Sequence, residues 1–323
     1  MRSAALRELR NLFPGAVMHC YVDAVGAEAL SLSHDPYRVV KVVNRSKRNR
    51  PLYLWRKALL HWNTRIESFD LFVDFYNGPS SRRLLLNSNS RRVLFIRDSK
   101  VISIPPSRAV TTRTHSNTHH LSNLYFRMLG HLYGTTPCSP DVRPWVGPKT
   151  VRDHHTKFDH RHYFVSLATG DPRKNPPLEL MRQLAGWLHS ERGLIPIIAC
   201  NPGQENLQKD FEQYLLVAGI PFLSLEPLGL TNLLSIMESV RLSILPDTGL
   251  FHLAVAAGRP LFGIFTHTHP QLVDPHLPHV KFAFIPNDLG LMDQNGLRYG
   301  TKEIPLTLAI QNLKALLSNT ECS

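Results

Sequence analysis

A strand-turn-helix segment around residue 248 carries residue types suited to holding a phosphate group. An apolar strand pattern at residues 242–245 leads into the turn Asp247-Thr248-Gly249, and a helix pattern with His252 in its first turn follows. Helix N-termini present unpaired N–H groups and a partial positive charge, and a glycine there lets a ligand approach the backbone. Asp247 and His252 would then flank the phosphate. Ordinary helix capping by Asp247, with His252 bonded locally, is the alternative interpretation.

A basic loop at residues 168–177 occupies a similar place after an earlier strand pattern. It contains Thr169, Arg173 and Lys174 and lies just before a helix pattern. Open α/β sheets bind their ligands at the carboxyl ends of strands. Either Arg173 or Lys174 can supply the cation that stabilises a leaving diphosphate. A solvated basic turn is the alternative.

Together these segments resemble glycosyltransferase family 9, the bacterial ADP-heptose:lipopolysaccharide heptosyltransferases. Residues 247–265 are similar to the family's Asp-Ser/Thr-Gly-x-x-His-Leu-x-Ala-Ala run and to the strand after it. The following loop matches at Thr268 and Pro270 and has His267 where the family has a glycine. The loop 168–177 is similar to the family's Thr-x-x-x-x-Lys-x-Trp-Pro loop, with a proline in place of the tryptophan.

Two further segments extend the resemblance and assign roles to residues. Residues 201–205 are similar to the family's Gly-x-Pro-x-Glu turn, and residues 228–233 resemble the loop and helix that line its base pocket. The resemblance implies that Lys174 and Asp247 act in catalysis, with Lys174 neutralising the donor diphosphate. It implies Glu205 at the nucleotide ribose and His252 orienting the Asp247 turn. The implied donor-binding residues are Thr169, Lys174, Glu205, Asp247, Thr248, Gly249 and His252.

The resemblance also implies an architecture and a reaction. The fold is expected to be α/β of the GT-B type, with two Rossmann-like, doubly wound parallel-sheet domains facing a cleft. Residues 1–150 would form the acceptor-side domain and residues 151–323 the nucleotide-sugar domain, with a final helix packing back on the first domain. The reaction would be inverting transfer of heptose from ADP-heptose to the lipopolysaccharide inner core. No metal or other cofactor is expected, and the sequence has no Asp-x-Asp pair.

The local patterns are those of elements that can position such a site. Strand patterns occur at residues 16–22, 39–43, 71–75, 93–96, 163–167, 195–199, 242–245 and 261–265. Helix patterns occur at residues 4–12, 52–62, 178–190, 206–218, 249–257 and from Pro305 onward, and Thr231 is a suitable N-cap for a further short helix. Strands that alternate with helices predict parallel sheets covered on both faces. The Pro-rich residues 135–160 mark the expected domain boundary.

Composition narrows the class of protein. The 323 residues suffice for about two domains, and 43% hydrophobic residues exclude a disordered or collagen-like chain. No apolar run reaches the ~18 residues of a membrane span, and Arg7, Glu8 and Arg10 interrupt any signal-peptide core, so a cytoplasmic protein is expected. Four scattered cysteines predict neither a zinc site nor a disulfide framework. The clustered histidines are interpreted as solvated.

The N-terminal half resembles the family more loosely. Residues 5–16 are similar to its first helix, and residues 69–75 to an Asp-hydrophobic-Asp strand. In the family a strand and a Gly-Asp turn precede that helix, and the aspartate is the presumed general base. The chain starts at Met1 inside the helix, so this strand and turn are expected to be missing. Either the true start lies upstream of Met1, or the protein cannot use the usual base and is a catalytically impaired chain that binds a nucleotide sugar. A family 9 transferase with a different sugar donor is a further alternative.

The net charge of +12 calls for an anionic partner. A lipid-linked lipopolysaccharide acceptor would account for the basic cluster of Lys41, Arg45, Lys47, Arg48, Arg50, Arg56 and Lys57, and it predicts peripheral contact with the anionic inner membrane surface. A solvated basic face is the alternative. Nucleic acid is not expected as a partner, because no recognition-helix, RRM or zinc-finger pattern is present.

Overall fold

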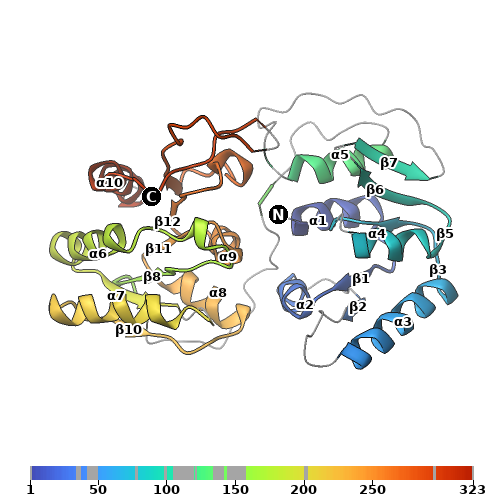
Figure 1. Cartoon of the computed structure of the whole chain (residues 1–323), viewed down its shortest axis with the longest axis horizontal. Helices are drawn as coiled ribbons and strands as arrows, with labels where there is room; N and C mark the ends of the chain where they lie inside the picture. Colours follow the sequence, from blue (N-terminus) through green and yellow to red (C-terminus); the bar gives the residue numbers. More distant parts are fainter. Residues whose placement is uncertain are drawn as a thin grey trace. The chain divides into compact units, whose positions relative to one another are not determined.

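The computed structural model divides into two compact units, Met1–Pro148 and Lys149–Ser323 (Figure 1). It describes residues 2–33, 38–41, 50–76, 79–97, 100–104, 120, 122–133, 142–143, 158–199, 203–293 and 296–321. The first unit is called unit 1 and the second unit 2. Among these residues, none of the helices has the length and apolar character needed to cross a membrane.

Among the described residues, unit 2 is built on one six-stranded sheet in which every pairing is parallel. Its strands are β8 (His162–Val165), β9 (Ile195–Ile198), β10 (Leu223–Ser224), β11 (Leu242–Leu245), β12 (Leu261–Ile264) and β13 (Val280–Ala283). Their order, β10-β9-β8-β11-β12-β13, reverses direction between β8 and β11. This is the Rossmann order, in which ligands bind outside the carboxyl ends of the strands at the reversal.

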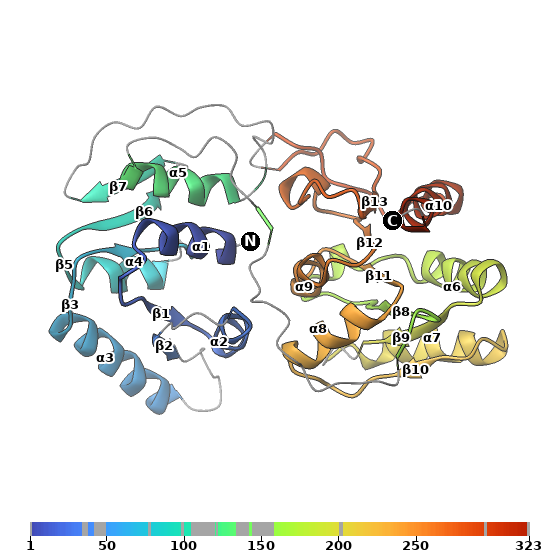
Figure 2. The ribbon, with the colours of Figure 1, turned by 180° about the vertical axis from the view of Figure 1, so that it is seen from behind.

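Two groups of helices cover the faces of this sheet (Figures 1 and 2). In one group α6 (Leu178–Arg192) contacts both α7 (Glu205–Val217) and α10 (Leu306–Glu321), and α10 also packs on β12 and β13. In the other, α8 (Leu230–Ser239) packs on α9 (Gly249–Ala257), which contacts β11 and β12. The short 3₁₀ helices η1 (Pro172–Lys174) and η2 (Pro270–Leu272) follow β8 and β12.

Buried apolar strands explain why the sheet forms. All residues of β8, β11 and β12 are buried, as a parallel sheet covered on both faces requires. Large side chains such as Tyr163, Phe211 and Phe262 join the core beneath α6, α7 and α10. Helix α9 ends at Gly258, whose φ of 69° is the left-handed conformation that glycine adopts without strain.

Most strand and helix predictions for unit 2 are confirmed within one or two residues. The Thr231 N-cap is wrong, because Gly229 has the extended cap conformation and Thr231 already lies inside α8. Strands β10 and β13 were not predicted. Strand β13 contains an exposed lysine, Lys281, that interrupts its apolar pattern.

The described residues of unit 1 form three small sheets. Strands β1 (His19–Val22) and β2 (Arg38–Lys41) pair in parallel, as do β3 (Ser68–Phe69) and β5 (Asn89–Ser90). In the third sheet β4 (Phe72–Val73) is parallel to β6 (Val93–Arg97), which pairs antiparallel with β7 (Lys100–Ile104). That last pair departs from the expected parallel order, because two residues between β6 and β7 are too few for a parallel crossover.

The described helices of unit 1 are α1 (Arg2–Leu12), α2 (Ala24–Ser31), α3 (Arg50–Ile66), α4 (Pro79–Leu86) and α5 (Ser122–Tyr133). Its described core is divided among separate clusters. Phe126 and Leu129 of α5 pack with Ala4 and Ala5 of α1, while Leu85 of α4 packs with residues of β6. The predicted helices 4–12 and 52–62 are confirmed as α1 and α3.

Candidate functional site

The candidate site lies at the carboxyl ends of β8, β11 and β12, where the strand order reverses. The loop after β8 forms η1, Asp247 lies between β11 and α9, and Thr266 follows the end of β12 at Ile264. The side chains therefore reach this edge of the sheet from the segments that directly follow β8, β11 and β12. Such an edge is where a doubly wound sheet holds its ligand.

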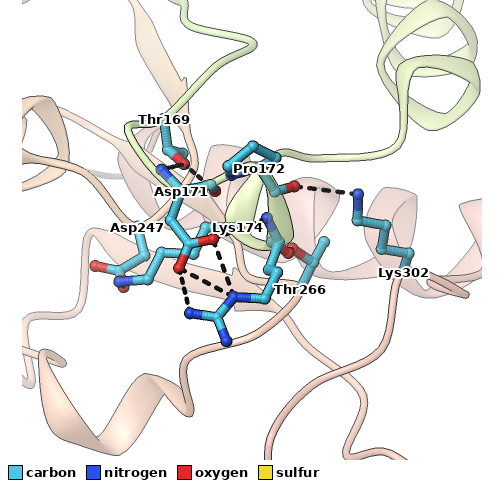
Figure 3. Close-up of polar contacts among 8 residues, drawn as sticks. Thr169, Asp171, Pro172, Lys174, Asp247, Thr266 and Lys302 are labelled. Atoms are coloured by element: carbon cyan, nitrogen blue, oxygen red, sulfur yellow. Dashed lines mark hydrogen bonds and ion pairs between the residues drawn. The ribbon is translucent and has the colours of Figure 1, made fainter.

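An ion pair crosses the reversal point. The Lys174 Nζ donates to Asp247 Oδ2 at 2.6 Å, although the residues are 73 positions apart in the chain (Figure 3). The Lys174 side chain is 29% exposed and that of Asp247 10% exposed. A lysine ammonium has three N–H donors, so the bond to Asp247 leaves two for an incoming anion. Asp247 thus orients a cation that a ligand can still reach.

The N-terminus of α9 beside this pair has an unusual cap. Thr248 takes the extended cap conformation, but its side chain accepts no bond from the helix. Its Oγ1 is buried and, among the described residues, has no hydrogen-bond partner. Buried polar atoms normally have partners, so such an exception requires an explanation. Next to it, Gly249 faces open space, since an added Cβ would meet no atom within 4 Å.

The loop that carries Lys174 is held by its own polar groups. The Thr169 hydroxyl donates to the Asp171 carbonyl at 2.5 Å and accepts from the Asp171 N–H at 3.1 Å. Asp171 caps η1 by accepting from the Arg173 N–H, and it also binds the Arg173 guanidinium at 2.7 Å. These bonds from Arg173 hold the pKa of Asp171 well below its usual range. Thr169 is therefore a loop-closing residue in this structure.

Gln204 and Asn175, which were not predicted, join this loop to α7. The Gln204 side chain donates to the Thr169 carbonyl and accepts from Asn175 Nδ2 at 3.1 Å. The Asn175 Oδ1 in turn accepts from the Thr169 N–H at 2.7 Å. Glu205, the next residue, begins α7 beside the loop, is exposed, and accepts from the Gly203 N–H at 2.7 Å. That bond lowers the pKa of Glu205.

Thr266 and Lys302 hold the far side of η1 (Figure 3). The buried Thr266 hydroxyl donates to the Arg173 carbonyl at 2.8 Å, and Lys302 Nζ donates to the Pro172 carbonyl at 3.2 Å. Thr266 lies in the loop compared with the family pattern but at a position that the pattern does not assign, and Lys302 lies in none of the matched segments. Their contacts join positions 93 and 130 residues apart, so no sequence signal could have identified them.

His267 occupies the position where the family pattern has a glycine. Its ring stacks on Tyr299 with centroids 4.4 Å apart and planes 4° apart. Burial, followed by the positive charges of Arg173 and Lys174, lowers the pKa of His267, and Asp171 and Asp247 oppose this. The site therefore has an aromatic pair with a neutral imidazole beside its cations. His252, also predicted, lies in the first turn of α9, half-buried, 5.7 Å from the Phe251 ring centroid.

The structure thus brings Thr169, Lys174, Asp247, Thr248 and Gly249 to one edge of the sheet, with Glu205 next to the loop that carries Lys174. Within the part of the chain that the structure describes, no group of three or more His, Cys, Asp or Glu side chains could hold a metal ion.

The sequence match covers the elements just described. Residues 144–287 match the model of glycosyltransferase family 9 (heptosyltransferase). This segment is a glycosyltransferase family 9 domain. It includes β8 through β13 and all of the predicted site residues, so the predicted resemblance to the family is confirmed for this segment. No curated protein sequence matches the chain significantly.

Solved structures share the fold over nearly the whole chain. A glycosyltransferase family 9 protein from Veillonella parvula DSM 2008 has a TM-score of 0.70 at 14% identity, covering 98% of this chain and 92% of that one. The E. coli ADP-heptose lps heptosyltransferase II has a TM-score of 0.64 at 14% identity, with coverages of 99% and 95%. E. coli heptosyltransferase WaaC with ADP-2-deoxy-2-fluoro heptose has a TM-score of 0.57 at 15% identity, with coverages of 96% and 93%. The predicted GT-B-like α/β fold with parallel sheets is confirmed.

Proposed function

We propose that the protein is an inverting glycosyltransferase that moves heptose from ADP-heptose to a lipid-linked acceptor of the lipopolysaccharide inner core. The observation that carries the proposal is the Lys174–Asp247 pair beside the N-terminus of α9 at the strand reversal of a family 9 domain. Two E. coli proteins of similar fold support it, the ADP-heptose lps heptosyltransferase II and heptosyltransferase WaaC with ADP-2-deoxy-2-fluoro heptose.

Lys174 is the proposed catalytic cation. As the bond from the anomeric carbon to the diphosphate breaks, negative charge grows on the leaving ADP. An ammonium already oriented by Asp247 stabilises that charge without reorganisation. Asp247 acts in catalysis by holding the ammonium in place.

The N-terminus of α9 is the proposed phosphate cradle. Its first-turn N–H groups and partial positive charge suit a diphosphate, and the open space at Gly249 admits one. The unpartnered Thr248 hydroxyl would gain a phosphate or sugar oxygen as its partner. Thr169 and Glu205 contact the donor through the loop and α7, and His252 orients the Asp247 turn.

The proposed reaction is a single displacement at the anomeric carbon of the heptose. An acceptor hydroxyl oxygen attacks the anomeric carbon from the face opposite the diphosphate, the carbon–oxygen bond to the diphosphate breaks, and ADP leaves with the bonding electrons. The hydroxyl proton passes to a base. The acceptor would be bound by the N-terminal part of the chain, in peripheral contact with an anionic membrane surface.

Transfer assays with purified protein, ADP-heptose and heptose-free lipopolysaccharide test the proposal. ADP release and the added heptose mass are measured together. Replacing Lys174 by Ala should reduce the rate by about 10²–10³-fold. Lys281→Ala on β13 removes an exposed lysine outside the site and serves as the control. ADP binding without transfer by the unaltered protein would overturn heptosyl transfer and support the nucleotide-sugar-binding alternative.

A further inference from the structure

Helix α3 presents an apolar stripe on the outside of unit 1. Trp55, Leu59, Trp62 and Ile66 follow the spacing i, i+4, i+7 and i+11 of one helix face. They are 62%, 43%, 65% and 64% exposed. On the opposite side Thr64 is fully buried, and α3 contacts β5. Figures 1 and 2 show α3 along the margin of unit 1. An amphipathic helix whose apolar face is turned outward needs a partner for that face.

The positive charge of the protein is concentrated around this helix. Residues 36–66 contain nine Lys and Arg and no Asp or Glu. Residues 1–148 hold 22 Lys and Arg against 9 Asp and Glu, and residues 149–323 hold 15 against 16. The net charges are +13 and −1, which together make the +12 of the chain. This excess of positive charge is a property of the sequence. The described part of the structure excludes residues 42–49 and the side chains of Lys41, Arg50, Arg56 and Lys57.

A groove of about 520 Å³ runs beside the stripe, between α3 and α4. Leu54, Ala58 and Trp62 supply apolar lining, and Arg65 and Arg83 supply cations from the two helices. Both arginines are exposed, and among the described residues neither forms an ion pair. Apolar lining with cations at the same groove matches the chemistry of an amphiphile with an anionic headgroup.

We propose that α3 docks unit 1 on an anionic phospholipid surface. The apolar stripe lies in the boundary between headgroups and acyl chains, where tryptophan is enriched. Arg65 and Arg83 meet headgroup phosphates, and the surrounding basic residues add long-range attraction. A second copy of the chain is disfavoured as the occupant, because it would bring the same positive charge to the interface. The inference rests on the proposed function, since a lipid-linked acceptor would lie at such a surface.

Vesicle binding by the full chain tests the docking surface. Vesicles of phosphatidylethanolamine with phosphatidylglycerol are compared with vesicles of phosphatidylcholine alone, by co-sedimentation at low and high salt. The unaltered protein should bind the anionic vesicles and release them at high salt. The double variant Trp55→Ser/Trp62→Ser should bind at least about tenfold more weakly, and Arg65→Gln/Arg83→Gln should lose part of the binding and its salt dependence. Both pairs are exposed, so neither variant should alter folding.

A matched control separates the stripe from apolar exposure in general. Leu216 and Val217 on α7 of unit 2 are 63% and 79% exposed, and Leu216→Ser/Val217→Ser should bind vesicles as the unaltered protein does. Equal binding by the tryptophan variant, equal binding to phosphatidylcholine, or self-association that disappears in that variant would each overturn the proposal. Vesicle binding is measured without nucleotide, and transfer with a delipidated acceptor. If the unaltered protein transfers heptose but does not bind anionic vesicles, the docking surface alone is overturned. If it binds the vesicles but does not transfer heptose, the proposed function alone is overturned.

Discussion

The two units use their surfaces differently. Unit 2 is nearly neutral, and its chemically distinctive side chains gather at the carboxyl edge of one parallel sheet. Unit 1 carries the excess positive charge, and the distinctive feature of its described residues is the exposed apolar face of α3. A continuous sheet places loops from distant parts of the chain at one edge, which is what a small-ligand site requires. An exposed helix face is instead suited to contact with an extended surface.

The largest expected change is in the free energy of unfolding, when a side chain in the core of unit 2 is removed instead of one in the apolar stripe of unit 1. Phe262→Ala empties a fully buried position in β12 and should lower the free energy of unfolding by about 3–5 kcal/mol. Trp62→Ala removes a larger side chain that is 65% exposed and should cost less than about 0.5 kcal/mol. Urea denaturation followed by circular dichroism measures both. Similar losses would mean that the α3 face is covered and the contrast is wrong.

A glycine behind the site provides the next test. A Cβ on Gly300 would stand 2.9 Å from the backbone carbon of Thr266, the residue that holds η1. Gly300→Ala should therefore cost about 1–3 kcal/mol of unfolding free energy and weaken ADP binding. Gly170→Ala is the matched control, since a Cβ there meets nothing within 4 Å. If the two variants unfold alike, the packing of Gly300 against Thr266 does not support the site.

Removing the Thr248 hydroxyl should stabilise the folded protein and weaken ADP binding, because this buried group has no partner among the described residues. Thr248→Val removes a buried polar atom without a partner and should raise the free energy of unfolding by about 1 kcal/mol. It should also weaken ADP binding about tenfold, the loss of one hydrogen bond to a charged group. Thermal unfolding and titration calorimetry measure the two quantities. Thr307→Val, at an exposed position in α10, should change neither. Unchanged ADP affinity in Thr248→Val would remove this hydroxyl from the proposed cradle.

The smallest expected effect concerns pH and compares one histidine in each unit. Burial, followed by nearby arginine charges, lowers the pKa of both His267 and His131 below 6.5 in the folded protein. The unfolded chain then binds more protons as the pH falls below 6.5, so the stability from each neutral imidazole is complete above that pH and declines below it. Each contributes at most about 1.4 kcal/mol per pH unit.

His267→Asn should therefore flatten the pH dependence of unfolding in unit 2, and His131→Asn that in unit 1. Denaturation curves between neutral and mildly acidic pH measure the slopes, with His160→Asn at an exposed position as the control. A slope that stays the same in His267→Asn would show that this imidazole titrates alike in the folded and unfolded chain.

Local sequence determined the elements that bear the site. Apolar runs predicted β8, β9, β11 and β12, and the strand-turn-helix pattern at Asp247 predicted α9 with its bounds. These features depend on residues within a few positions of each other, such as the helix stop at Gly258. The resemblance to family 9 rested on the same segments. It identified Lys174 and Asp247 separately, one in each loop.

Tertiary structure alone decided which of these residues meet. The bond from Lys174 to Asp247 exists because β8 and β11 are neighbours in the sheet. Local periodicity predicts strands but not their order in a sheet. For the same reason, the sequence did not predict the roles of Gln204 and Thr266, whose partners lie 35 and 93 residues away. In unit 1, periodicity predicted that α3 is a helix, but only packing decided that its tryptophans face outward while Thr64 is buried. Burial depends on what the rest of the chain places against a helix, and residues near in sequence do not determine that.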